Sequence, residues 1–398
     1  MTVSKKCMLL ILISVFLLTG CWDKKELSTI SVITGMAIDK GEKHKYLFSI
    51  EGVNARELNP KTTTGVSASV VYSMEGDSIA ELARKVNTGI GRHVIYSHMK
   101  VLVISEELAR EGVLEFVDYL ERNREIRDDF NFIVARDAKA ADILKITYQV
   151  QKSSSLKLFS QLRTMKKEWG GDPNVRLNDV VSALTSPGRQ PVMQAVRLTG
   201  NPEKGSNVGN MNKVTPDTMV VSDSMAVFKG ARLKGFMNME HTRNYLWLQD
   251  DILQTSVAIP CGKEGLVTLR IYNTKTKTKA YMVNGKAKVN VRIHAVGYIE
   301  GTQCSEDLSS VQSYEKLEDY ASDHIKMTIE GTVKKAQEKY KADIFGFGEV
   351  LYRQHPKTFN KVEKNWDEVF TKGEIDVEVN FIIRRSGIRT KSFLQNLK

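Results

Sequence analysis

Alternation of apolar and polar residues predicts strands along the whole chain. The clearest case is EIDVEVNFII near the C-terminus, where Ile375, Val377, Val379, Phe381 and Ile383 are separated by polar residues. A period of two is typical of a strand with one buried face. Weaker strand patterns, several of them next to turn-forming residues, cover residues 28–39, 46–52, 66–73, 98–104, 130–135, 266–272 and 289–298.

Apolar residues at helical spacing predict helices between these strands. In GDSIAELARKV, the residues Ile79, Leu82 and Ala83 share one helix face, and Ser78 with Glu81 matches a capping box. Similar patterns cover residues 105–109, 113–124, 138–146, 239–249 and 314–340, and two shorter helices follow the turn at 343–349. Strands and helices mixed in this way predict the α+β class, with helices packed against mixed sheets.

The length of 398 residues exceeds one ordinary core and predicts two or three domains. Two segments, residues 186–191 and 200–216, concentrate Gly, Pro, Asn and Ser. We interpret them as surface loop and domain junction. Residues 224–237 then favour a hairpin.

The first twenty residues follow a different pattern. Lys5 and Lys6 precede an apolar run from Cys7 to Leu18, and Thr19 and Gly20 are small. A helix of that run would rise only about 18 Å, short of a hydrocarbon core of roughly 30 Å. The pattern therefore favours a cleaved signal peptide over residues 1–20, with an uncleaved anchor as the alternative.

The sequence Leu18-Thr19-Gly20-Cys21 matches a bacterial lipobox, in which the cysteine thiol is alkylated by diacylglycerol before cleavage. Each buried methylene contributes about 0.8 kcal/mol, so two acyl chains would contribute on the order of 20 kcal/mol. We therefore expect Cys21 to carry S-diacylglycerol and an N-acyl chain and to tether the mature chain outside the cytoplasmic membrane. Two other cysteines, Cys261 and Cys304, then remain, and spacing alone leaves their pairing open.

The basic balance of the chain suggests an anionic neighbour. The formal net charge is +11, and loss of Lys5 and Lys6 with the signal peptide lowers it by two. An anionic leaflet attracts such a surface, whereas export separates the chain from nucleic acid. In NTKTKTKA, the side chains of Lys275, Lys277 and Lys279 would share one strand face. They either protect a solvated edge strand or contact an anionic partner or lipid surface.

Candidate catalytic and cofactor motifs are weak. The seven histidines include no pair at helical i, i+4 spacing, and no Walker motif occurs. Gly346 and Gly348 lack the third glycine of a dinucleotide fingerprint. The triplet Gly76-Asp77-Ser78 also marks a family of serine esterases, but Asp319 and His324 have the wrong spacing for the second esterase element. The sequence therefore predicts no enzyme, no metal and no cofactor.

Several segments together resemble the C-subunit lipoproteins of bacterial spore nutrient-germinant receptors, the Ger(x)C family. The matching pieces, in order, are residues 20–23, 26–27, 35–39, 98–109, 124–127, 228–236, 242–247 and 342–348. They span nearly the whole chain. Lys25 and Asn244 depart from the family pattern, which often has Arg and Gly there.

This resemblance implies three consecutive α+β domains, each a mixed β-sheet packed with α-helices. We place them at residues 21–195, 222–275 and 276–398, with a loop or linker at 196–221. It also implies a lipid anchor on the outer face of the spore inner membrane and two integral-membrane partner subunits, of A and B type. A lipid-tethered solute-binding protein that itself captures the nutrient is the alternative function.

Overall fold

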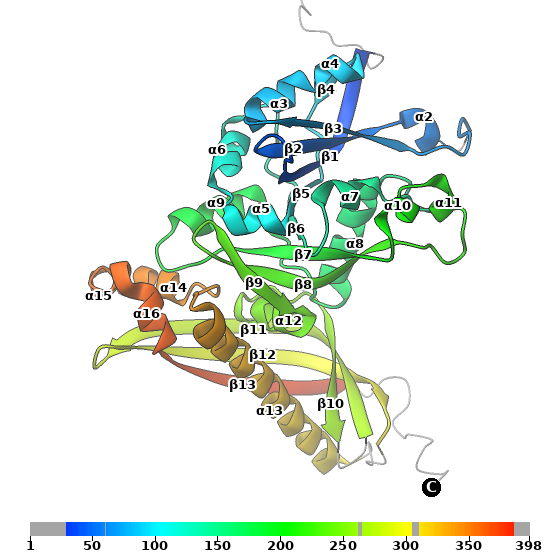
Figure 1. Ribbon diagram of the computed structural model, residues 1–398. Coiled ribbons are helices and arrows are strands. Elements are labelled where there is room, and N and C mark those ends of the chain that lie inside the picture. Colours follow the sequence, from blue (N-terminus) through cyan, green and yellow to red (C-terminus); the bar gives the residue numbers. More distant parts are fainter. Residues whose placement is uncertain (1–28, 60, 262–264, 305–309, 386–398) are drawn as a thin grey trace, which may run out of the picture.

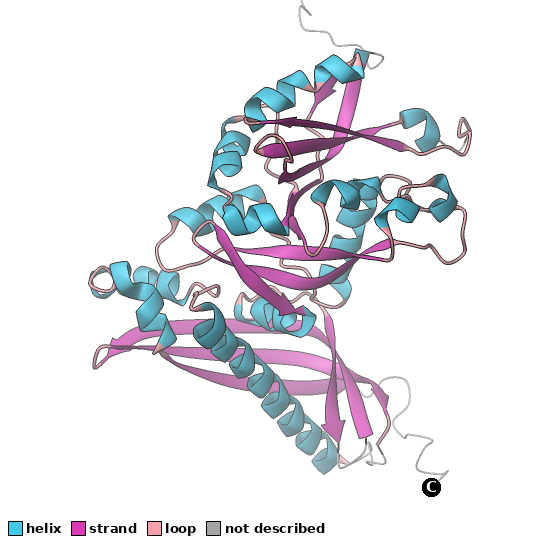
Figure 2. Ribbon diagram, viewed as in Figure 1, coloured by secondary structure: helices cyan, strands magenta, loops and turns pink. Residues whose placement is uncertain are grey.

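The computed structural model describes residues 29–59, 61–261, 265–304 and 310–385. The expected signal peptide and Cys21 lie outside these residues. The described strands form two sheets, which lie one below the other in the view of Figure 1, with helices beside and between them (Figure 2).

The first sheet is mixed and has the strand order β3-β2-β1-β5-β6-β7-β8-β9, with β4 paired to β1. Strands β1, β5, β6 and β7 run parallel, and the remaining pairs on the main path are antiparallel. The strands are β1 (Ile30–Lys40), β2 (Tyr46–Val53), β3 (Ser69–Gly76), β4 (His93–Ile95), β5 (Val101–Ser105), β6 (Asn131–Ala135), β7 (Val192–Thr199), β8 (Met219–Lys229) and β9 (Arg232–Asn238).

Helices cover both faces of this sheet. Apolar residues of α3, α5, α6 and α9 pack into the main core on one face, and those of α7 and α8 pack into a second apolar cluster on the other. The helices are α2 (Ala55–Leu58), α3 (Ile79–Lys85), α4 (Asn87–Ile90), α5 (Glu106–Glu111), α6 (Leu114–Arg122), α7 (Ala140–Lys145), α8 (Ser154–Glu168), α9 (Leu177–Thr185), α10 (Pro202–Gly205) and α11 (Val208–Met211).

Two buried carboxylates attach α7 and α8 to the sheet. Asp39, near the end of β1, accepts the backbone N–H groups of Ala140 and Ala141 at 2.6 and 2.9 Å. Glu51 of β2 accepts those of Ser154 and Ser155 at 2.9 and 2.8 Å. Both carboxylates therefore satisfy the first N–H groups of a helix, which have no partner within the helix itself.

The second sheet has the strand order β10-β11-β12-β13. Strands β10 (Thr255–Cys261), β11 (Gly265–Val283) and β12 (Lys286–Thr302) are antiparallel, whereas β13 (Glu374–Arg385) runs parallel to β12. The chain between β12 and β13 contains α13 (Val311–Lys335), a π-helical turn (Ala336–Tyr340), α14 (Phe347–Gln354), α15 (Pro356–Phe359), a 3-10 turn (Glu363–Asn365) and α16 (Trp366–Thr371). Helix α12 (Met239–Leu248) connects the sheets, and Figure 1 shows α13 crossing the second one.

The α+β class is confirmed, with a large mixed sheet and a second sheet packed with helices. The strand pairing differs from the expected segment boundaries in three places. Part of the expected linker at 196–221 lies in β7 and β8, β8 and β9 extend the first sheet, and β11 continues across residue 275. One apolar core also runs through both sheets, since it includes Phe48, Trp247 and Phe381. The expected boundaries were based on local composition, and local composition does not indicate which distant strands pair.

Most predicted elements are present with small shifts in their ends. The hairpin at β8–β9, the long helix α13 and the alternating strand β13 are confirmed. The strand expected at 66–73 begins three residues later, because β3 is set by its pairing with β2, where Val53 faces Ser69. Ser105, where the helix at 105–109 was expected to start, is the N-cap of α5 and accepts the N–H of Leu108.

The structure pairs Cys261 with Cys304, a question that spacing left open. The two Cα atoms are 6.4 Å apart, both residues are buried, and 43 residues of sequence separate them. The bond links the end of β10 to the chain that follows β12, on either side of β11.

We expect loss of this disulfide to lower the free energy of unfolding by about 3 kcal/mol, because it closes a long loop in the unfolded chain. The change is Cys261→Ser combined with Cys304→Ser, measured by urea denaturation of the soluble chain. Dithiothreitol should destabilise the original chain to a similar degree and leave the double variant unchanged. Two free thiols in the folded, unreduced protein would contradict the pairing.

Candidate functional site

The three lysines singled out in the sequence lie together on β11. Lys275, Lys277 and Lys279 are exposed, and they alternate with the more buried Thr276 and Thr278. Lys275 forms an ion pair with Asp250. The lysines therefore share one face of the strand, as predicted, and their contact with an anionic surface stays a prediction.

The neighbouring strands extend this charged face. Lys277 lies opposite Arg292 of β12, and Arg292 lies opposite Glu378 of β13, with 2.9 Å between the Arg292 Nε and Glu378 Oε2 atoms. The exposed face of the second sheet is thus basic along β11 and acidic along β13. Two cations opposite one another repel, so the β11 side would gain from an anionic neighbour.

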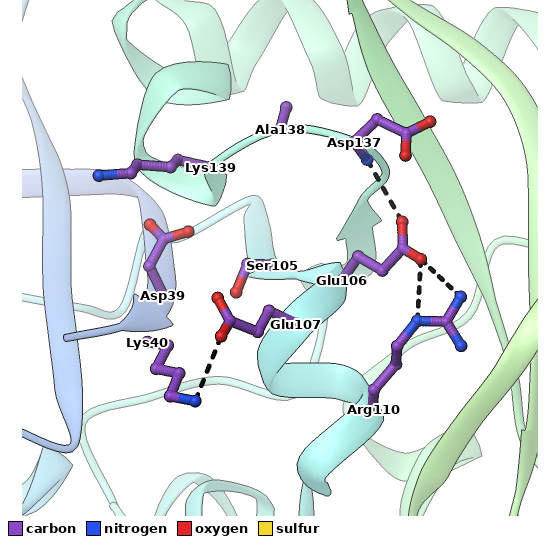
Figure 3. Close-up of a pocket in the computed structure, with 9 residues that line it drawn as sticks. All are labelled: Asp39, Lys40, Ser105, Glu106, Glu107, Arg110, Asp137, Ala138 and Lys139. Atoms are coloured by element: carbon purple, nitrogen blue, oxygen red, sulfur yellow. Dashed lines mark hydrogen bonds and ion pairs between the residues drawn. The ribbon is translucent and has the colours of Figure 1, made fainter. Parts of the chain in front are cut away.

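A crevice opens at the carboxyl ends of the parallel strands β1, β5 and β6 (Figure 3). Its volume is about 420 Å³, and its lining includes Asp39, Ser105, Glu107, Arg110 and Lys139. In open α/β sheets, ligands bind outside the carboxyl ends of strands, where neighbouring strands are connected in opposite directions. Strand β1 is such a place, since β2 pairs with it on one side and β5 on the other.

Most charged groups in the crevice are already paired with one another. Lys40 Nζ lies 3.2 Å from Glu107, and Arg110 pairs with Glu106 (Figure 3). Asp39 is buried, and burial raises the pKa of its carboxyl group. The N–H groups that open α7 are bonded to Asp39, and Ser105 caps α5. The crevice therefore contains side chains of both charges, and the backbone N–H groups at the starts of α7 and α5 that could bind a phosphate already have partners.

Ser78 acts as a helix cap. Its hydroxyl oxygen accepts the N–H of Glu81 at the start of α3, as predicted. Asp319 and His324 both lie on α13 beside the second sheet, so they do not form an esterase-type arrangement with Ser78. His44 instead contacts Asp77, with 3.1 Å between Nδ1 and Oδ2.

Asp343 organises the turn that precedes α14. This fully buried carboxylate accepts the N–H groups of Phe345, Gly346 and Gly348 at 3.2, 2.9 and 2.8 Å. It also accepts the indole N–H of Trp366 on α16 at 3.0 Å. Burial raises the pKa of the Asp343 carboxyl group to about 6 despite these four donors. The turn and α16 are thereby fixed to a single side chain.

The same turn meets a loop of the first sheet. A Cβ atom on Gly188 would lie 2.6 Å from the Gly348 Cα atom, and Gly188 has φ +75°, so the backbones approach closely only because both residues are glycine. Gln190 donates its N–H to the Asp343 carbonyl at 2.8 Å. The loop at 186–191, predicted from composition, is therefore a contact between the two sheets.

A polar hollow of about 650 Å³ lies beside this contact. Its lining includes Arg189, from the loop before β7, and Glu349 and Arg353, from α14. The guanidinium of Arg189 is 3.3 Å from the Tyr245 hydroxyl and 3.7 Å from the nearer Glu349 oxygen. These long contacts join the loop before β7 to α12 and α14; the side chains of Arg189 and Glu349 are partly exposed, and Tyr245 is buried.

Within the described residues, no cluster of three His, Cys, Asp or Glu side chains is arranged to hold a metal ion. Over the same ranges, no helix combines the length and the apolar character needed to cross a membrane.

Sequence reasoning missed the polar groups that organise the structure. The sequence indicates only that Asp343 begins a turn, and it indicates no role for Asp39, Glu51 or Arg189. The carboxylates that accept the first N–H groups of α7 and α8 come from β1 and β2. These strands lie about one hundred residues earlier in the sequence, so the sequence near each helix does not reveal them.

Comparisons with known proteins agree over the whole chain. Residues 23–198 match the family described as "Spore germination protein N-terminal domain", and residues 223–387 match "Spore germination B3/GerAC like, C-terminal". Spore germination protein KC of Bacillus subtilis (strain 168) is 30% identical over 404 residues, covering 99% of each chain. Spore germination protein B3 of the same organism is 25% identical over 375 residues, covering 93% of this chain and 95% of that protein.

A solved structure shows the same fold. The crystal structure of the GerBC protein matches with a TM-score of 0.57 and 21% identity, covering 91% of this chain and 100% of that chain. At this identity the match speaks for the fold alone. Taken with the full-length relatives, the chain belongs to the Ger(x)C family of spore germination proteins. Its role is in spore germination.

Proposed function

We propose that this chain is a lipid-anchored, non-catalytic subunit of a nutrient-germinant receptor. It acts by contact with two integral-membrane subunits of A and B type, on the outer face of the spore inner membrane. The observation that carries the proposal is the lipobox that ends at Cys21, placed directly before a chain that matches germination proteins from residue 23 onward. The anchor holds the chain where membrane-embedded partners are present.

The described structure supports an interaction role. The crevice at the carboxyl ends of β1, β5 and β6 carries charges that are mostly paired with one another, and the buried carboxylate of Asp343 serves the turn before α14. The sheets offer charged and edge-strand surfaces that suit protein contacts.

Cys21→Ala tests the anchor. We expect the variant to lose membrane attachment and to respond to nutrients at a small fraction of the original rate, because two acyl chains contribute on the order of 20 kcal/mol to attachment. Fractionation of spore membranes and the optical-density loss after nutrient addition measure the two effects.

Cys7→Ala is the matched control, since Cys7 lies in the apolar run that the signal peptidase removes. It should leave attachment and germination unchanged. Membrane attachment of the Cys21→Ala variant at the original level would refute the anchor.

The crevice in Figure 3 favours one alternative, capture of the nutrient by this chain itself. Its mixture of acidic and basic side chains suits a zwitterion such as an amino acid. Calorimetric titration of the soluble chain with single amino acids and sugars separates the two functions. Saturable binding without partner subunits, abolished by Arg110→Ala, would favour capture.

The lysines of β11 fit this scheme as a contact for an acidic protein surface. Cys21 and Thr29 are joined by a segment that reaches at most roughly 30 Å when extended. In Figure 1, the start of β1 and the hairpin of β11 and β12 lie toward opposite ends of the molecule. A contact by Lys275, Lys277 and Lys279 with protein is therefore favoured over one with the lipid near the anchor.

A further inference from the structure

Strand β3 is an edge of the first sheet with an open backbone. It pairs with β2 in unbroken antiparallel register from Ser69 to Gly76 and with no other strand of the described chain. In an antiparallel pair, every second residue directs its N–H and C=O groups away from the partner. Among the described residues, no hydrogen bond reaches the backbone from Val70 to Gly76 other than those with β2.

Natural sheets usually protect such an edge, and β3 lacks the basic residues, the proline and the bulge that commonly do so. Its sequence, SVVYSMEG, contains no Lys, Arg or Pro, and its pairing has no bulge. Its single charged residue, Glu75, is occupied by the N–H groups of Glu42 and Lys43, both at 3.1 Å.

The edges of the second sheet are protected by side chains. On β11, Asp250 accepts the Thr276 N–H at 2.7 Å, and the Gln354 amide bonds both the Ala280 N–H and the Thr278 carbonyl. These groups take the place of a neighbouring strand where β10 has ended.

Strand β13 is protected in the same way by two side chains of α13. Ser322 accepts the Phe381 N–H at 3.1 Å, and Glu318 accepts the Ile383 N–H at 2.7 Å. On β10, Arg243 donates to the Ser256 carbonyl at 2.9 Å. At the far edge of the first sheet, the Tyr340 hydroxyl donates to the Phe236 carbonyl of β9 at 2.6 Å. The open edge of β3 is thus an exception within one molecule.

The side chains of β3 are also incompletely covered. Val70, Tyr72 and Met74 share one face; Val70 is 46% exposed, and the other two are only partly buried against the main core. Val71, on the opposite face, packs partly against the second apolar cluster. Helices α3 and α7 pack against β3 from either face. One further strand beside β3 would extend both cores and cover Val70.

The edge lies close to the start of the described chain. Ile33 of β1 faces Gly52 of β2, and Gly52 faces Val70 of β3. Neighbouring strands are about 4.8 Å apart, so Val70 is roughly 10 Å from Ile33. Ile33 follows Cys21 by twelve residues. A tether at Cys21 therefore keeps this edge near the membrane surface.

From these observations we propose that β3 accepts an extended segment of an integral-membrane receptor subunit as an added strand. The segment has alternating apolar residues, which cover Val70 and Tyr72, and its backbone pairs with the open groups of β3. Main-chain pairing supplies affinity and the alternating side chains supply specificity. The inference rests on the proposed function and names the surface through which it operates.

Val70→Lys tests the edge, because an edge lysine opposes strand addition. The full-length lipoprotein is expressed with its partner subunits, and spore membranes are solubilised in detergent. We expect integral-membrane receptor subunits, identified by mass spectrometry, to co-purify at least tenfold less well with the variant. Val283→Lys is the matched control, since Val283 is 44% exposed on the part of β11 that does not pair with β10, and this variant should co-purify normally.

Hydrogen exchange of the original protein provides a second readout that does not depend on the variant's folding. In the complex, alternate amides between Val70 and Gly76 should exchange at least tenfold more slowly than in the free chain. A photo-crosslinking residue in place of Val70 should join the chain to a receptor subunit.

The outcomes separate the two proposals. Unchanged exchange in β3, or full co-purification of Val70→Lys, would overturn the strand addition and leave the proposed function standing. Crosslinks to a second copy of this chain would overturn the choice of partner. If the original protein co-purifies with no integral-membrane subunit, the proposed function and the inference both fail.

Discussion

Asp343→Ala should lower the free energy of unfolding by about 4 kcal/mol, since four buried donors lose their acceptor and each unsatisfied group costs roughly 1–3 kcal/mol before the structure relaxes. Three of the donors are backbone N–H groups of the turn before α14 and of the first turn of that helix, and the fourth is the Trp366 indole. Urea denaturation at pH 7 measures the change. We also expect altered Trp366 fluorescence, because the Trp366 indole loses its hydrogen bond to this turn.

Two further variants test whether Asp343 acts through these bonds. Asp343→Asn keeps the shape and one acceptor oxygen, so we expect a smaller loss, about half as large. Trp366→Phe removes a single donor and should lose about 1 kcal/mol beyond the effect of the smaller ring. In the double variant Asp343→Ala with Trp366→Phe, the losses of the two single variants should not add, because the indole hydrogen bond is lost only once. Fully additive losses would show that the bond contributes nothing.

The loss should reach beyond the turn itself. Asp343 also accepts the Gln190 N–H through its backbone carbonyl, and Gly188 packs on Gly348. Loosening of this turn therefore loosens the contact between the two sheets. We expect faster hydrogen exchange in α14 and in the loop at 186–191 of Asp343→Ala, with little change in β1 and β5.

Local patterns in the sequence predicted local structure well. Strict alternation located β13, and helical spacing located α13, because each pattern records a single buried face. Ser78 is predictable as a helix cap because the N–H group that it accepts lies three residues away. The parallel pairing of β13 with β12 was not predictable, since more than seventy residues and several helices separate the two strands.

The lipobox was predictable from the sequence and the polar network was not, for the same reason. Cys21 is recognisable because its neighbours in sequence carry the whole signal, although it lies outside the described residues. The acceptor role of Asp343 depends on Trp366, 23 residues later, and that of Glu51 on α8, more than one hundred residues later. Two of the longer helices, α8 and α9, were not predicted. The start of α8 is fixed partly by Glu51, which is distant in the sequence. The open edge of β3 likewise became visible only when the strand order was known.

Asp172 is the second group with a large expected effect. It follows α8, is fully buried, and has one oxygen bonded to the Asn174 N–H at 2.9 Å; the other has no partner among the described residues. Burial raises the pKa of this carboxyl group from 3.8 to about 7, with Lys166 opposing the shift and Asp251 adding to it. The folded chain thus binds the Asp172 proton more tightly than the unfolded chain does.

Because the folded pKa of Asp172 is raised, its contribution to stability is complete below about pH 4 and falls as the pH rises through 7. About three pKa units correspond to roughly 4 kcal/mol. Asp172→Asn removes this titration, so at pH 8 we expect the variant to be more stable than the original chain by up to about 4 kcal/mol, and near pH 4 to be no more stable. Urea denaturation of both chains from pH 4 to 8 measures the difference, in which the titration of Asp343 cancels.

Asp251→Asn, at the half-exposed partner of Lys166, is the control and should change stability by less than about 1 kcal/mol. Parallel stability curves for Asp172→Asn and the original chain would show that Asp172 is ionised in the folded protein throughout this range.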